Sequence, residues 1–424
     1  NLTSIQSTLC SKEPTLAKRA RLRAHLRHLD IHRITTIFNT LVEIQGPLGI
    51  IWIEREITMT TGVKILYAAT MSLALAFGFL HVFIPDFEYD FDRLHIFFFN
   101  LCAGGSILLY FTSGQKSVPT RIHVYFGLTV IYAVMAFFKL YWASILLSIP
   151  IIALVESVRI KRFGFFPFDF FRAVPTQDKF LQASMLCLSI GATVASFVML
   201  NNQYLQLFRL EKLTIDVFFL GYSFPLSLLT FSVMYAHMDQ EGSKLYKILK
   251  EISFWSITLG VIFFFVFIIF ELVAAEVIIS NTLMAAVIMT YVIFLQHAKE
   301  GEQRAILSSG MMFLVVTGLT GVFYLFEYIW PEVGDYHRLL LILHATVALY
   351  GWNLSGLFVV VRGDNLPIFR RIAPIIALHW IAVMILAPAG KYYAIGSLLA
   401  LPAYMALVGL VFFKKKLSNS PEQS

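Results

Sequence analysis

The chain has 424 residues, of which 58% are hydrophobic and 14% charged, and its mean hydropathy is +0.74. Soluble domains average about 45–50% apolar and about 25% charged residues. This composition therefore excludes a soluble protein and predicts that lipid is the solvent for much of the surface. The net charge of +7 does not indicate a nucleic-acid partner, because basic loops on one side of a membrane produce the same balance.

The three cysteines are Cys10, Cys102 and Cys187, and none forms a Cys-x-x-Cys pair. Their spacing predicts neither a disulfide framework nor a thiolate metal site.

Residues 1–58 differ from the rest of the chain, whose first methionine is Met59. We interpret this segment as an upstream extension of the reading frame or as a basic cytoplasmic arm. Its best apolar run, Pro47–Ile53, is too short for a signal peptide. Residues 59–424 are predicted to form a single transmembrane domain.

Apolar runs long enough to cross a bilayer, about 20 residues each, predict an all-α, multi-pass protein with about twelve spanning helices. The predicted ranges are 63–84, 94–114, 121–139, 142–159, 179–200, 213–237, 251–272, 274–297, 305–329, 338–361, 367–387 and 391–413. One long apolar stretch must turn back between Glu271 and Glu276.

Loop charges orient these helices. The loops and tail that we place inside carry 18 lysines and arginines, against six in the loops placed outside. This bias alternates loop by loop and predicts that both termini are cytoplasmic. We expect the protein to lie in a cell membrane, namely a bacterial or archaeal inner membrane. The longest inner loop, 160–178, interleaves aromatic with basic residues. This pattern favours a segment lying among lipid headgroups, with docking of a membrane or cytoplasmic partner as the alternative.

Histidines inside the bilayer are the most informative polar residues. His81 closes the first helix, His95 opens the second, and His344 lies in the outer part of the tenth, so these three share the outer leaflet. His379 lies deeper, in the eleventh helix. Two neutral imidazoles on facing helices can ligate a haem iron. Arg93 and Arg338 lie where they would pair with haem propionates. Lone membrane histidines also serve simply as hydrogen-bonding groups.

Two short segments, FDRLHIFFFN (residues 91–100) and HATVALYGW (residues 344–352), carry a resemblance to a known superfamily. With the twelve helices, they resemble the large subunits of heme-copper oxidases and nitric oxide reductases. Smaller relatives of this architecture include haem-containing membrane proteins linked to the nitric oxide response. The resemblance implies one low-spin haem b, for electron transfer or gas and redox sensing. Its iron ligands would be His95 and His344, with His81 as an alternative partner of His95.

The departures from the superfamily pattern concern its catalytic metals. The pattern requires a second histidine two positions from His344, but Ile342 and Thr346 stand there. The sixth helix has only His237, at the wrong end, and the seventh has no histidine. Because these ligands are missing, a binuclear centre is excluded, and oxygen or nitric oxide reduction is not expected.

A secondary transporter is the second interpretation, since twelve helices with both ends inside is also a transporter plan. Ionisable residues in the spans would then couple protons or cations. The candidates are Glu156, Asp216, Glu271, Glu276, Glu327 and His379.

A non-catalytic membrane subunit or assembly factor is the third interpretation. No nucleotide-binding, zinc-protease or nucleophile-elbow motif is present in the sequence.

Overall fold

The computed structural model describes residues 59–84, 89–207, 211–326, 336–363 and 372–414, without the side chains of 211–220. The predictions made for residues 1–58 and for Glu327 lie outside the described residues. The side chain of Asp216 also lies outside them, although its backbone belongs to a helix.

Within these ranges the long regular elements are helices, which we number 1 to 12 in chain order. They are α3 (Thr61–Phe83), α4–η1–α5 (Phe91–Ser113), α6 (Thr120–Phe137), α7 (Tyr141–Phe163), α8–η3 (Thr176–Leu205), α9 (Glu211–Ala236), α10 (Lys244–Ile269), α11 (Val273–His297), α12 (Glu302–Leu325), α13–η6–α14 (His337–Arg362), α15–η7–α16 (Ala373–Gly390) and α17 (Ala394–Phe413). Eleven of them, all but α9, are long and apolar enough to cross a membrane, judged on the described residues. The multi-pass helical class is therefore confirmed; the orientation of the termini stays a prediction.

One helix start differs from the prediction by more than three residues within the described part of the chain. Helix α10 begins at Lys244 rather than at residue 251, because its first two turns are amphipathic and were missed by a search for apolar runs. Ser243 caps this start by accepting a hydrogen bond from the Tyr246 amide. The predicted start of helix 11, residue 367, lies outside the described residues. The described part of this helix begins at Ala373, and Pro374 lies in its first turn, where a proline removes no helical hydrogen bond.

The predicted reversal near Glu271 is confirmed. Helix α10 ends at Ile269, α11 begins at Val273, and the backbone turns with Glu271 in the left-handed region at a φ of 55°. Such a tight connection forces α10 and α11 to run antiparallel and side by side.

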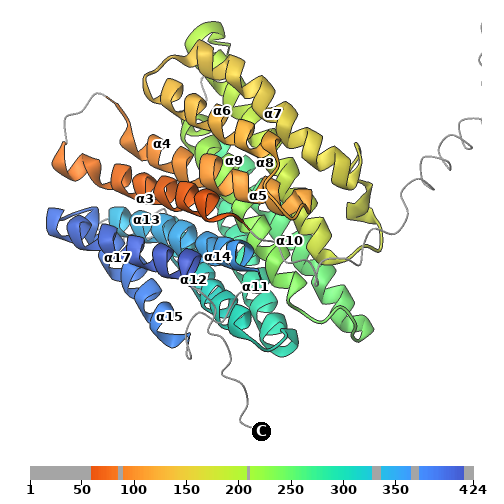
Figure 1. Ribbon diagram of the computed structural model, residues 1–424. Coiled ribbons are helices and arrows are strands. Elements are labelled where there is room, and N and C mark those ends of the chain that lie inside the picture. Colours follow the sequence, from red (N-terminus) through yellow and green to blue (C-terminus); the bar gives the residue numbers. More distant parts are fainter. Residues whose placement is uncertain (1–58, 85–88, 208–210, 327–335, 364–371, 415–424) are drawn as a thin grey trace, which may run out of the picture. The chain divides into compact units, whose positions relative to one another are not determined.

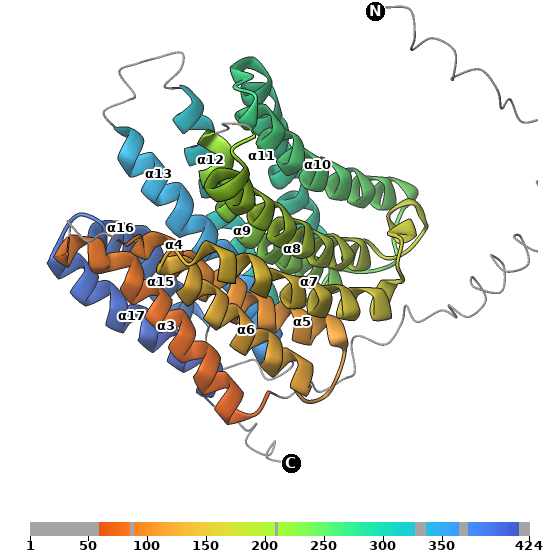
Figure 2. The same ribbon diagram turned by 90° about the horizontal axis from the view of Figure 1, so that it is seen from above.

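The helices pack in three groups of four neighbours (Figures 1 and 2). In the first group α15–η7–α16 lies against α17, α17 against α3, and α3 against α4 and η1, so the last described helix packs beside the first one. Helices 3 to 6 form the second group, and helices 7 to 10 form the third. Helices 2, 6 and 10, the last of each group, also contact one another.

The buried share of each helix follows from its place in these groups. Helix 2 is almost entirely buried, whereas α6 and α10 expose most of their apolar length. Close approach within the second group depends on Gly191 and Gly221, because a Cβ atom at Gly191 would lie 2.6 Å from the Cα of Gly221. Small residues at helix crossings allow this kind of membrane packing.

Candidate functional site

His95 lies on α4 (Phe91–Ile96) and is 8% exposed. Its Nδ1 donates a hydrogen bond of 2.8 Å to the carbonyl of Ala74 on α3. The ring covers Gly78, one turn further along, where a Cβ atom would lie 2.7 Å from Nδ1. Since a carbonyl only accepts, the neutral imidazole carries its proton on Nδ1 and keeps a lone pair on Nε2.

Tyr350, on helix 10, is the partner of His95 across the helix groups. Its hydroxyl lies 3.0 Å from Nδ1 and 3.3 Å from Nε2 of His95. With Nδ1 committed to Ala74, Nε2 is the atom that accepts from the hydroxyl. The phenol ring packs edge-on against Phe99 and Tyr404, with centroids at 5.0 and 5.2 Å. Tyr350 is 2% exposed, so this contact is sealed inside the helices.

His379 approaches the same tyrosine from helix 11. Its Nε2 donates a 2.6 Å hydrogen bond to the backbone carbonyl of Tyr350. The ring lies between Phe313 and Phe358, with centroids at 4.9 and 5.7 Å, and the residue is 4% exposed. His379 therefore fixes the backbone of Tyr350, while His95 contacts its side chain. We call His95, Tyr350 and His379 the histidine–tyrosine cluster.

His344 has a different neighbour. Its Nδ1 donates a 3.0 Å hydrogen bond to the carbonyl of Thr317 on α12, and its ring lies against Gly321, four residues later. Tyr350 follows His344 by six residues, which is about 9 Å along a helix. The described contacts of His95 and His344 include none between them.

Three of these helices change to π-helical hydrogen bonding next to a histidine. The π segments are η1 (Phe97–Gly104), η6 (Val347–Asn353) and η7 (Ile381–Leu386), which begin two or three residues after His95, His344 and His379. Short π segments inside α-helices are rare and frequently occur at functional sites.

Polar residues gather at the end of helix 2 that carries His95. Asp92, one turn before His95, forms a 2.6 Å ion pair with Lys391, which lies between helices 11 and 12. The Nε2 of His81 lies 3.4 Å from the Lys391 carbonyl. Asp92 has a side chain that is 56% exposed.

The two arginines assigned to propionates have other contacts in the structure. Arg93 forms a 2.9 Å ion pair with Asp90, and Arg338 lies 5.0 Å from the ring of Tyr392.

The candidate carboxylates are dispersed. Glu156 accepts hydrogen bonds from Arg159 and Ser189, of 2.6 Å each, and so joins α7 to α8. Glu271 lies in the turn before α11, and Glu276 is buried in the first turn of that helix. None of these described carboxylates joins the histidine–tyrosine cluster.

The sequence analysis missed Tyr350, Tyr404 and the Asp92–Lys391 pair. Asp92 had a detectable signal, because it lies three residues before His95 and so on the same helical face. Tyr350 had none, since it is one of 18 tyrosines in an aromatic-rich chain.

Within the described ranges, no group of three or more His, Cys, Asp or Glu side chains is arranged to hold a metal ion. Comparisons with known proteins give no assignment either: no family model, curated protein or solved structure matches the chain.

Proposed function

We propose that this integral membrane protein is a proton-coupled transporter in which His95 binds the coupled proton. The observation that carries the proposal is the contact between His95 on helix 2 and the Tyr350 hydroxyl on helix 10, both buried among apolar helices. Ionisable side chains are costly in the bilayer, and histidine chains mark proton pathways in pumps and transporters.

Protonation would change the contact between the two helices. Neutral His95 accepts a hydrogen bond from the Tyr350 hydroxyl at Nε2, because Nδ1 donates to the Ala74 carbonyl. A proton added to Nε2 makes both ring nitrogens donors. The Tyr350 hydroxyl must then turn its own proton away from the ring, which loosens or reverses the link between helices 2 and 10. A local charge change acting on a link with two arrangements is a basis for coupling.

Asp92 supplies the route to the outer surface. It is exposed and lies one turn before His95, so it can take a proton from water and stabilise a charged imidazole. Its ion pair with Lys391 neutralises it in the described arrangement. His379 acts as a positioning residue, because it holds the carbonyl of Tyr350 and not the hydroxyl.

The test is proton flux into liposomes that contain purified full-length protein, driven by a potassium diffusion potential and followed by a trapped pH-sensitive dye. No solute is supplied, so the assay reads uncoupled proton slippage through the carrier. We expect this slippage to exceed the leak of protein-free liposomes, to be lost in His95→Gln and to be reduced in Tyr350→Phe. His123→Gln is the matched control, because His123 is exposed at the start of α6. Flux in His95→Gln equal to that of the unchanged protein would refute the proposal.

A bis-histidine haem is the second candidate, and the matched settings of His95 and His344 favour it. Each Nδ1 donates to a backbone carbonyl of the preceding helix. Each ring also lies over the glycine that follows the carbonyl residue by four positions on that helix. Ligand histidines are typically oriented in this way. Helices 2, 6 and 10 also contact one another, as suits the heme-copper oxidase superfamily, in which these helices carry metal ligands.

A single iron would need the Nε2 atoms of both histidines on opposite faces of one macrocycle. In the described arrangement His95 packs on α3 with Tyr350 beside it, while His344 packs on α12. Haem binding therefore requires the His95 ring to leave the Tyr350 hydroxyl and to turn its Nε2 towards the iron.

An absorption spectrum of the dithionite-reduced protein tests the haem candidate. Absence of an α-band after expression with haem supplied would reject it. An α-band lost in both His95→Ala and His344→Ala, and retained in His379→Ala, would establish the axial pair and require the two rings to move together.

A further inference from the structure

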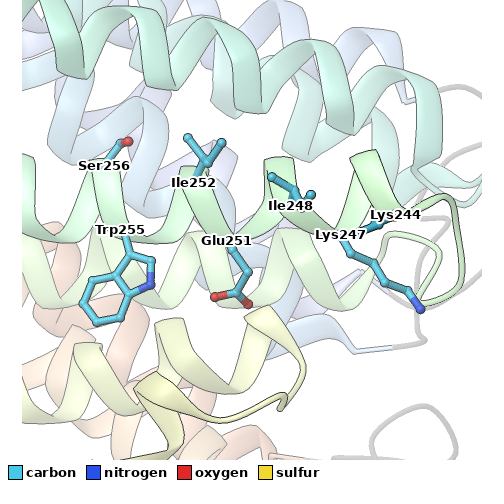
Figure 3. Close-up of a pocket in the computed structure, with 7 residues that line it drawn as sticks. All are labelled: Lys244, Lys247, Ile248, Glu251, Ile252, Trp255 and Ser256. Carbon is cyan, nitrogen blue, oxygen red and sulfur yellow. The ribbon is translucent and has the colours of Figure 1, made fainter.

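A groove on the first half of α10 has the composition of a lipid site (Figure 3). Its volume is about 440 Å³, and it is lined by residues of α10 from Lys244 to Ser256. Two cations, Lys244 and Lys247, stand at one end, Ile248 and Ile252 follow along the wall, and Trp255 lies at the other end.

The two lysines supply uncompensated positive charge. Both are exposed, and neither forms an ion pair with a described acidic residue. The acidic residue in the groove, Glu251, is already neutralised by Lys179 at 2.7 Å. An occupant of this end is therefore favoured when it carries negative charge.

An aromatic segment packs beside the Trp255 end of the groove. The 3₁₀ helix η2 (Phe168–Phe171) packs on α10, with ring centroids of Phe171 and Trp255 at 5.5 Å and of Phe170 and Phe254 also at 5.5 Å. Phe171 itself is 80% exposed. Trp255 follows Lys247 by eight residues, or about 12 Å along the helix. Cations at the headgroup level followed by exposed aromatics match the layers of a bilayer interface.

We propose that this groove binds a phospholipid with an anionic headgroup. The phosphate lies between Lys244 and Lys247, and the acyl chains run along Ile248 and Ile252 towards Trp255 and Phe171. Lysines clustered at the cytoplasmic end of a membrane helix attract anionic lipid headgroups. The loop charges predict that this end of α10 is the cytoplasmic one. The site does not involve the histidine–tyrosine cluster, so it stands apart from the proposed proton coupling.

The experiment uses full-length protein exchanged into vesicles containing equal parts of phosphatidylglycerol and phosphatidylcholine, then purified in detergent. Native mass spectrometry counts the phosphatidylglycerol retained. We expect the Lys244→Gln, Lys247→Gln double variant to bind it about 30-fold more weakly, since each lysine near an anionic surface contributes about 1 kcal/mol. Trp255→Ala should also lower retention while leaving both cations in place.

The matched control is the Lys116→Gln, Lys299→Gln double variant, which removes the same charge from loops predicted to lie on the same side. Retention by this control should equal that of the unchanged protein. Equal losses in both double variants would overturn the proposal, because they indicate diffuse attraction to a basic face. Displacement of the lipid by millimolar inorganic phosphate would also overturn it, in favour of a site for free anions.

Discussion

His95 and His344 are held in the same way by two different pairs of helices. Each Nδ1 donates to a carbonyl on the preceding helix, Ala74 or Thr317, and each ring covers the glycine four residues later, Gly78 or Gly321. Among the described contacts of the two rings, that of His95 with the Tyr350 hydroxyl is the one that reaches a polar side chain in another helix group. A backbone carbonyl and a glycine on the preceding helix thus orient each histidine. The side chain that the free ring nitrogen meets in another helix group determines the chemistry open to it.

Alanine substitution of the two glycines should have the largest effect, because it tests how tightly each histidine ring is packed. Gly78→Ala would place a Cβ atom 2.7 Å from a ring that two contacts hold in place, so we expect a loss of about 1–3 kcal/mol from overpacking. Gly321→Ala meets His344 at 3.1 Å and should cost less.

Thermal unfolding of the two glycine variants in one detergent measures the difference. Equal midpoints for the two variants would show that the His95 ring is no more constrained than that of His344.

The link between His95 and Tyr350 predicts energetic coupling of intermediate size. Side-chain hydrogen bonds between membrane helices average about 0.6 kcal/mol in double-mutant cycles. We therefore expect about that coupling energy between His95→Gln and Tyr350→Phe, measured from unfolding of both single variants and the double variant.

A cycle between His344→Gln and Tyr350→Phe is the control for this coupling. It should give additive effects, because His344 contacts α12 and not Tyr350. Additive effects in both cycles would show that His95 is no more strongly linked to Tyr350 than His344 is.

The ion pair between Asp92 and Lys391 should have the smallest effect on stability. Asp92 is more than half exposed, so solvent screens its 2.6 Å contact with Lys391, and Lys391→Gln should cost only about 0.2–0.5 kcal/mol. The same variant removes the cation that neutralises Asp92. We expect unfolding to change little while proton flux in the liposome assay changes measurably, and flux identical to that of the unchanged protein would remove Asp92 from the proposed route.

The helices themselves were predictable because the signal is local. An apolar run of about 20 residues is stable in lipid only as a helix, whatever it packs against. The predicted ranges therefore lie close to the observed helices, including the reversal at Glu271. The start of α10 was missed for the same reason, since Lys244 and Lys247 interrupt the apolar run although the backbone is helical.

The sequence alone determined the helical membrane class, the approximate helix limits and the position of individual histidines such as His379 along their helices. Tertiary structure decided which residues meet: His95 with Tyr350, 255 positions away, and Asp92 with Lys391, 299 positions away. Such pairings depend on how each helix is rotated and on which helices become neighbours. Apolar periodicity in lipid does not encode either property, because lipid-facing and buried surfaces are both apolar.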